Sequence, residues 1–125
     1  MKSPKIYYAH SKIIYGTARE QEEILFLKQK YPAAVIINPA NNISRKTMPQ
    51  FLKLVGDCNL LVVSEFDGFV GKGAFSEITR ALSDDKTVYA MRRQGKKYNL
   101  IIVSGVMIIK SHDWKKEYAK LILNN

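Results

Sequence analysis

The sequence predicts a single α/β domain over residues 1–125, built on a mostly parallel sheet of about five strands flanked by helices. β-prone and helical segments alternate from residue 6 to residue 91, as expected of β-α-β units whose strands run parallel. The run at 59–64 (NLLVVS) lacks polar alternation, which is typical of a central parallel strand covered on both faces. The chain has 125 residues, of which 46% are hydrophobic, and this is enough for one hydrophobic core.

Local signals support each element in order. A β-prone run at 6–9 follows Pro4, and Thr17-Ala-Arg-Glu20 is a capping box that predicts the start of a helix. That helix should end near Pro32, because the residue before a proline disfavours helical geometry. The further expected segments are a strand at 34–37, a loop at 41–49, a short helix at 51–56, the strand at 59–64, a glycine loop at 65–73, a helix at 74–82, a strand at 87–91, a basic turn at 92–97, strands at 100–103 and 106–109, and a last amphipathic helix beginning at Ser111 or Asp113.

Cysteine and histidine usage excludes several classes of site. Cys58 is the only cysteine, so the chain forms no internal disulfide or cysteine-based zinc site. His10 and His112 lie far apart in the sequence, and we expect neither a metal nor a cofactor. The chain begins without the apolar core of a signal peptide and has no run of about 18 apolar residues. We therefore expect a cytoplasmic protein that makes no membrane contact.

The charge is strongly positive but unevenly distributed. The formal net charge is +9 and the isoelectric point is about 9.7, which favours an anionic partner such as a nucleotide or nucleic acid. Residues 1–53 carry nine bases and three acids, and residues 86–125 carry nine bases and two acids. The middle segment, 54–85, carries six acids and two bases. A plain nucleic-acid-binding protein has no need of such an acidic segment.

Most chemically active residues fall where a doubly wound sheet binds ligands. Ligands lie beyond the carboxyl ends of the strands, where the strand order reverses, and this rule selects residues 8–11, 38–42 and 65–77. Glu77 follows the glycine loop there, with Asp57 and Asp67 near in sequence. Several carboxylates in one cleft suit glycosidic chemistry, in which one attacks or stabilises the anomeric carbon and another assists the leaving group.

Structural explanations exist for the same residues. A carboxylate such as Glu77 in the first turn of a helix is stabilised by the helix dipole, and Asp57 is equally suited to capping the chain before the third strand. Glycines in a loop can serve only to form a flexible turn. Tyr7 and Tyr8 alternate across the first strand, so one faces each side of the sheet, one in the core and the other near a base or a carboxylate. His10 is a possible acid or base, although most loop histidines are simply solvated.

Three motifs together resemble the nucleoside 2-deoxyribosyltransferase superfamily, including its branch of deoxynucleoside 5'-monophosphate N-glycosidases. They are KIYYAHS at 5–11, GDCNLLVV at 56–63 and GKGAFSEITRAL at 71–82. The resemblance covers roughly residues 5–91 in element order. It implies a Rossmann-like three-layer fold and cleavage of, or transfer from, the N-glycosidic bond of a 2'-deoxynucleoside or its 5'-monophosphate, with no cofactor.

The resemblance also implies roles for individual residues. Glu77 corresponds to the nucleophile, Asp57 to a residue that binds or protonates the base, and Tyr7 to a neighbour of the sugar and the carboxylate; we expect these three side chains to converge on one crevice. The expected substrate contacts are Tyr8, His10, Ser11, Asp67, Gly71, Lys72, Gly73 and Ser76. The expected partners are a small nucleoside or nucleotide and further copies of the chain in a homo-oligomer.

Two other functions remain compatible with the sequence. One is a non-catalytic domain that binds or senses a nucleotide in the same crevice. The other is a basic nucleic-acid-binding protein, which would use the turn at 92–97 together with the last helix. The turn is equally well explained as a hairpin kept soluble by its lysines.

Overall fold

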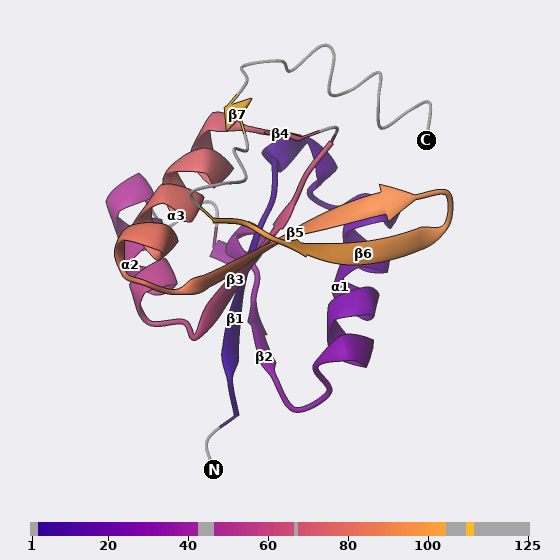
Figure 1. The fold of residues 1–125 in the computed structure, drawn as a ribbon, viewed down its shortest axis with the longest axis horizontal. Coiled ribbons are helices and arrows are strands. Elements are labelled where there is room, and N and C mark those ends of the chain that lie inside the picture. The colour runs from indigo at the N-terminus through magenta and orange to yellow at the C-terminus, as the bar shows by residue number, and fades with distance from the viewer. Residues whose placement is uncertain (1–2, 43–46, 67, 105–109, 112–125) are drawn as a thin grey trace.

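The computed structural model of the chain describes residues 3–42, 47–66, 68–104 and 110–111. Strands and helices alternate over residues 5–64, and further along the chain some strands follow one another directly, as the ribbon in Figure 1 shows. The elements are β1 (Lys5–Ala9), η1 (Lys12–Ile14), α1 (Ala18–Lys30), β2 (Val35–Ile37), η2 (Pro39–Asn42), α2 (Met48–Gly56), β3 (Leu60–Ser64), β4 (Phe69–Val70), α3 (Lys72–Ser83), β5 (Thr87–Gln94), β6 (Lys97–Ile102) and β7 (Lys110–Ser111), where η marks a 3₁₀-helix.

Five strands form the main sheet, in the order β2-β1-β3-β5-β6. β2, β1, β3 and β5 run parallel, and β6 returns antiparallel to β5. The prediction of a mostly parallel sheet of about five strands is therefore confirmed, with β3 at its centre as the apolar run predicts. The chain passes from β1 outward to β2 and then back across β1 to β3, so the strand order reverses between β1 and β3.

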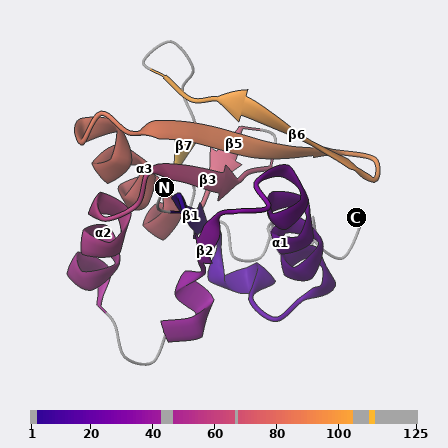
Figure 2. The ribbon, with the colours of Figure 1, turned by 90° about the horizontal axis from the view of Figure 1, so that it is seen from below.

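Helices cover both faces of this sheet, as Figure 2 shows, with α1 on one face and α2 and α3 on the other. Tyr7 and Tyr8 are both fully buried and face opposite sides, as the alternation predicts. Tyr7 packs with Leu61, Val63 and the apolar residues of α2 and α3. Tyr8 packs with Val62 and with Leu27 of α1. The fold is thus a three-layer α/β arrangement with one hydrophobic core on each face.

The residues that precede α1 and α2 cap these helices with hydrogen bonds. The Thr17 side chain accepts a hydrogen bond from the Glu20 amide at 3.3 Å, which is one half of the predicted capping box. The Glu20 carboxylate instead accepts from the Gly16 amide at 3.0 Å, so the reciprocal bond is made one residue earlier. Thr47 begins α2 with a complete capping box to Gln50. A proline is compatible with the first turn of α2, because a backbone N–H at that position would have no partner within the helix.

Several boundaries differ from the predictions. α2 begins at Met48 and α3 at Lys72, each earlier than expected, because Thr47 and Gly71 take the cap positions. β5 extends to Gln94, and the basic turn is a hairpin whose two central residues begin with Gly95 at φ 64°, a conformation that suits glycine. Ser111 lies in the two-residue strand β7 rather than at a helix start. The predicted strand at 106–109 and the last helix lie outside the described residues.

Candidate active site

Glu77 and Tyr7 form a buried pair beside the point where the strand order reverses. The Tyr7 hydroxyl donates a hydrogen bond to Glu77 Oε2, and the two residues are 0% and 5% exposed. Glu77 is the sixth residue of α3 and lies in its second turn, so the expectation that Glu77 stabilises the helix from the first turn is wrong. Burial raises the pKa of Glu77 to about 7, and the Tyr7 hydrogen bond offsets part of that rise. A carboxylate with this pKa changes its ionisation near neutral pH.

Within the described residues, the side chain of Glu77 accepts fewer hydrogen bonds than the other buried carboxylates. Among the described residues, four glutamates are buried. Glu20 bonds His10 at 2.6 Å, Glu23 bonds Arg19 at 3.1 Å and Glu65 bonds Arg92 at 2.5 Å. In the part of the chain that the structure describes, the neutral phenol of Tyr7 is the one hydrogen-bond partner of the Glu77 carboxylate. Because an uncompensated buried charge is costly, such a carboxylate marks a functional position more than a structural one.

The loop after β1 contributes the rim of this site. Tyr15 is half-buried, and burial together with the negative charges of Glu77 and Glu20 raises the pKa of Tyr15. Its ring packs on that of His10, with 4.7 Å between the centroids. A Cβ placed on Gly71 would lie 3.9 Å from the side chain of Ser11, so Ser11 lies next to the start of α3. Tyr15 was not predicted from the sequence, because its loop carries no periodic pattern.

Glu65 is the second residue that the sequence analysis missed. It is 1% exposed and directly follows β3, at the carboxyl end of the central strand. Its side chain accepts bonds from the Gly68 amide and from Arg92 Nε, both at 2.5 Å. Glu65 could have been predicted, since it lies within the selected range 65–77. The first residue after a parallel strand lies at the ligand-binding edge of the sheet.

The α1 face of the same edge holds a separate polar cluster. The carboxylate of Glu23 accepts bonds from the Tyr8 hydroxyl at 2.5 Å, from Arg19 Nε at 3.1 Å and from Ser64 Oγ at 2.7 Å. All four residues are buried, so Tyr8 is bound within the protein and not open to a substrate. Arg19 also lies 3.8 Å above the ring of Phe66. These contacts connect α1 to the carboxyl ends of β1 and β3.

His10 is buried rather than solvated. It is 4% exposed, its ring stacks on Tyr8 with 3.8 Å between centroids, and its two nitrogens contact the Tyr8 carbonyl and the Glu20 carboxylate. Burial lowers the pKa of His10, and the two hydrogen bonds oppose that change. His10 thus supports the loop that carries Tyr15, and the structure gives it no open face for a substrate.

The expected convergence of Tyr7, Asp57 and Glu77 is met by two of the three residues. Asp57 is exposed, ends α2 and precedes β3, so it lies at the amino edge of the sheet, opposite to the edge formed by Ser64 and Glu65. Asp67 lies outside the described residues.

The remaining predicted contacts lie at the start of α3. Gly71 caps the helix, and Lys72 and Gly73 form its first turn. Ser76 is exposed, and its hydroxyl bonds the Lys72 carbonyl of its own helix at 3.2 Å. Gly71 is thus placed beside Ser11, whereas Ser76 faces solvent. No group of three metal-ligating side chains occurs among the described residues. In the same part of the chain, no helix is long and apolar enough to span a membrane.

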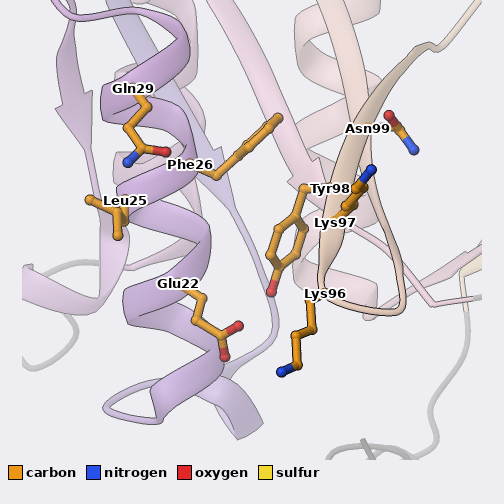
Figure 3. A pocket seen from close by; sticks show the side chains of 8 residues that line it. All are labelled: Glu22, Leu25, Phe26, Gln29, Lys96, Lys97, Tyr98 and Asn99. Carbon is orange, nitrogen blue, oxygen red and sulfur yellow. The ribbon is translucent and has the colours of Figure 1, made fainter.

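A groove of about 420 Å³ lies on the face opposite to Glu77, between α1 and the β5–β6 hairpin. Figure 3 shows Phe26 of α1 and Tyr98 of β6 on its two walls, with Lys96 and Lys97 at the hairpin end. The predicted basic turn therefore lines this groove. Of the two arginines of this turn, Arg92 pairs with Glu65, and Arg93 pairs with Glu22 of the groove lining at 3.9 Å.

The sheet order and the buried carboxylate at its switch point define a doubly wound, Rossmann-like α/β domain with a candidate active site at the carboxyl edge. A solved structure with this fold is the 2-desoxiribosyltransferase from Leishmania mexicana, with 13% sequence identity and a TM-score of 0.55. The match covers 92% of this chain and 95% of that chain. No protein-family model matches the chain, and no curated protein matches it in sequence. The comparison thus supports the fold along nearly the whole chain.

Proposed function

We propose that the protein cleaves the N-glycosidic bond of a 2'-deoxynucleoside or its 5'-monophosphate, or transfers the deoxyribosyl group, with Glu77 as the nucleophile. The observation that carries this proposal is the buried Glu77 at the switch point of the sheet, which is bonded by Tyr7 and has no cationic partner among the described residues. The structural neighbour is named as a 2-desoxiribosyltransferase, and this supports the same class of chemistry.

The chemistry requires an ionised Glu77. Its carboxylate oxygen attacks C1' of the sugar, the bond from C1' to the base nitrogen breaks, and the electron pair leaves with the base, which takes up a proton from water. Water, or the nitrogen of a second base, then attacks C1' and releases the Glu77 carboxylate. The attacking water, or the attacking N–H of the second base, loses the proton that balances the one gained by the leaving base.

Tyr7 controls both the position and the charge of the nucleophile. Burial and the neighbouring Glu77 raise the pKa of Tyr7 well above its usual range, so its phenol remains a hydrogen-bond donor at neutral pH. The donor holds one carboxylate oxygen and leaves the other for attack. We expect Ser11 and the amides at the start of α3 to contact the sugar or a phosphate, because Ser11 lies beside Gly71 and a helix N-terminus favours oxygen ligands with negative charge.

The test is release of free base from a panel of 2'-deoxynucleosides and their 5'-monophosphates, measured by chromatography. Wild-type protein should release base, and Glu77→Gln should lower the rate by at least about a hundredfold, since the nucleophile is removed. Glu22→Gln is the matched control, because Glu22 is an exposed glutamate on α1. Activity retained by folded Glu77→Gln protein would refute the role of Glu77, and a panel that yields no base would refute the proposed reaction.

A further inference from the structure

Arg92 lies on the same face of the sheet as Glu77. Side chains alternate along a strand, and Ala90 of β5 belongs to the core on the α2 and α3 side, so Arg92 two residues later points to that side as well. Along β3, Val63 belongs to the same core while Ser64 bonds Glu23 on the other face. Glu65 therefore also faces the α3 side, in agreement with its bond to Arg92.

The guanidinium of Arg92 is fixed by that bond. Its Nε donates to Glu65 Oε1 at 2.5 Å, and the other oxygen of Glu65 accepts from the Gly68 amide. The Arg92 side chain is 36% exposed, and the structure shows no further hydrogen bond for it within the described residues. This bond restricts the orientation of the planar group, which carries further N–H donors on its two terminal nitrogens.

A nucleoside can lie between the side chains of Tyr7 and Arg92. Tyr7 is level with Leu61 and Val88, so the backbone of Arg92 lies roughly 10 Å across the sheet and roughly 13 Å further along it, and the long arginine side chain covers part of this separation. A substrate whose anomeric carbon lies at Glu77 can extend its base across β3 toward β5. The carboxylate of Glu65 beside Arg92 disfavours a phosphate at this end, because like charges repel.

We propose that Arg92 recognises the leaving base, and that it selects a base with two adjacent acceptor atoms, such as O6 and N7 of a 6-oxopurine. This inference rests on the proposed function. Two parallel N–H donors of arginine match the O6 and N7 pair of guanine, whereas adenine presents a donor at the first of these positions. The hydrogen bonds from Arg92 also stabilise the negative charge that develops on the base as the glycosidic bond breaks.

The experiment measures binding of dGMP and dAMP by calorimetry to protein carrying Glu77→Gln, so that no turnover interferes. dGMP should bind about tenfold to a hundredfold more tightly than dAMP, as expected of one bidentate contact. Adding Arg92→Gln should abolish or reverse this preference, because glutamine suits the N6 and N7 pair of adenine. Arg92→Lys keeps the positive charge beside Glu65 but lacks the planar fork, and it should also lose the preference.

Arg80→Gln is the matched control, since Arg80 pairs with Asp84 on the surface of α3, and this variant should keep the preference for dGMP. Equal binding of the two nucleotides, or a preference that survives both Arg92 substitutions, would overturn the inference. Discrimination in binding without any base release by wild-type protein would reject the proposed reaction and keep the recognition role of Arg92. Base release by wild-type protein without a preference between dGMP and dAMP would keep the proposed reaction and reject the recognition role of Arg92.

Discussion

Replacing Glu77 with glutamine removes a buried ionisable group and keeps an oxygen that accepts the Tyr7 hydrogen bond. In the folded protein the pKa of Glu77 is about 7, against an ordinary value of 4.5, so the folded state holds the proton more tightly than the unfolded chain. Between these two values the folded state binds more protons, and the stability of wild-type protein therefore falls as pH rises through the window. Glutamine cannot ionise, so the stability of the variant does not fall in this way as pH rises.

The magnitude follows from the two pKa values. A tenfold change in proton concentration is worth about 1.4 kcal/mol, so the ionisation of buried Glu77 destabilises the folded state by about 1 kcal/mol at pH 5 and by about 3 kcal/mol at pH 8. We expect Glu77→Gln to exceed wild-type stability by these amounts. For a domain of this size, the difference at pH 8 corresponds to a rise in Tm of roughly 10 °C.

Urea unfolding at pH 5 and pH 8, followed by circular dichroism, measures both differences. Comparison of variant with wild type at each pH cancels the contributions of His10 and Glu23, which both proteins share. Glu22→Gln should change stability by less than about 0.5 kcal/mol at either pH, because Glu22 is exposed. A Glu77→Gln variant that is less stable than wild type at pH 8, or whose advantage is the same at both pH values, would refute the electrostatic reasoning.

Three further predictions test neighbouring contacts. Tyr7→Phe removes the donor that lowers the pKa of Glu77, so the midpoint of the rise of kcat/KM with pH should move above about 7, and an unmoved midpoint would exclude this role of Tyr7. Arg19→Met leaves the carboxylate of Glu23 buried without its cation and should cost about 3 kcal/mol in urea unfolding at pH 7.5, with part recovered by adding Glu23→Gln. Thr17→Ala removes the cap of α1 and should lower the free energy of unfolding by about 1 kcal/mol; a change below the experimental error would mean that the bond to the Glu20 amide contributes nothing.

The sequence predicted the sheet well because its signals are local. The apolar run at 59–64 required burial on both faces, and β3 is central. The alternation of Tyr7 and Tyr8 needs only the geometry of a strand, and the structure confirms it. The predicted helix starts were less accurate. Glycine disfavours helical structure, so the first turn of α3 was not predicted, because Gly71 caps this helix and Gly73 lies inside it.

The candidate site was predicted only in part, because closeness in sequence was taken for closeness in space. Asp57 lies twenty residues before Glu77 but precedes β3, whereas Glu65 follows it, and the two ends of a strand belong to opposite edges of the sheet. Glu23 of α1 was likewise missed, although it is fully buried. Burial of a charged residue depends on partners from distant segments, here Tyr8 and Ser64, which no local pattern encodes.

The pattern of partners around the buried carboxylates separates catalysis from simple nucleotide binding. A site that only binds an anionic nucleotide gains from cations and backbone amides, and a lone carboxylate in its floor repels the ligand. Glu23 and Glu65 each pair with an arginine, and Glu20 accepts hydrogen bonds from His10 and from the Gly16 amide, so packing explains all three. Within the described residues, Glu77 has a hydrogen bond only from the phenol of Tyr7, at the position where the fold binds ligands, and its ionisation weakens the folded state. A nucleophile needs just such a charged oxygen, with little solvent around it and one lone pair left open, so this arrangement favours chemistry at the site over storage or sensing of a nucleotide.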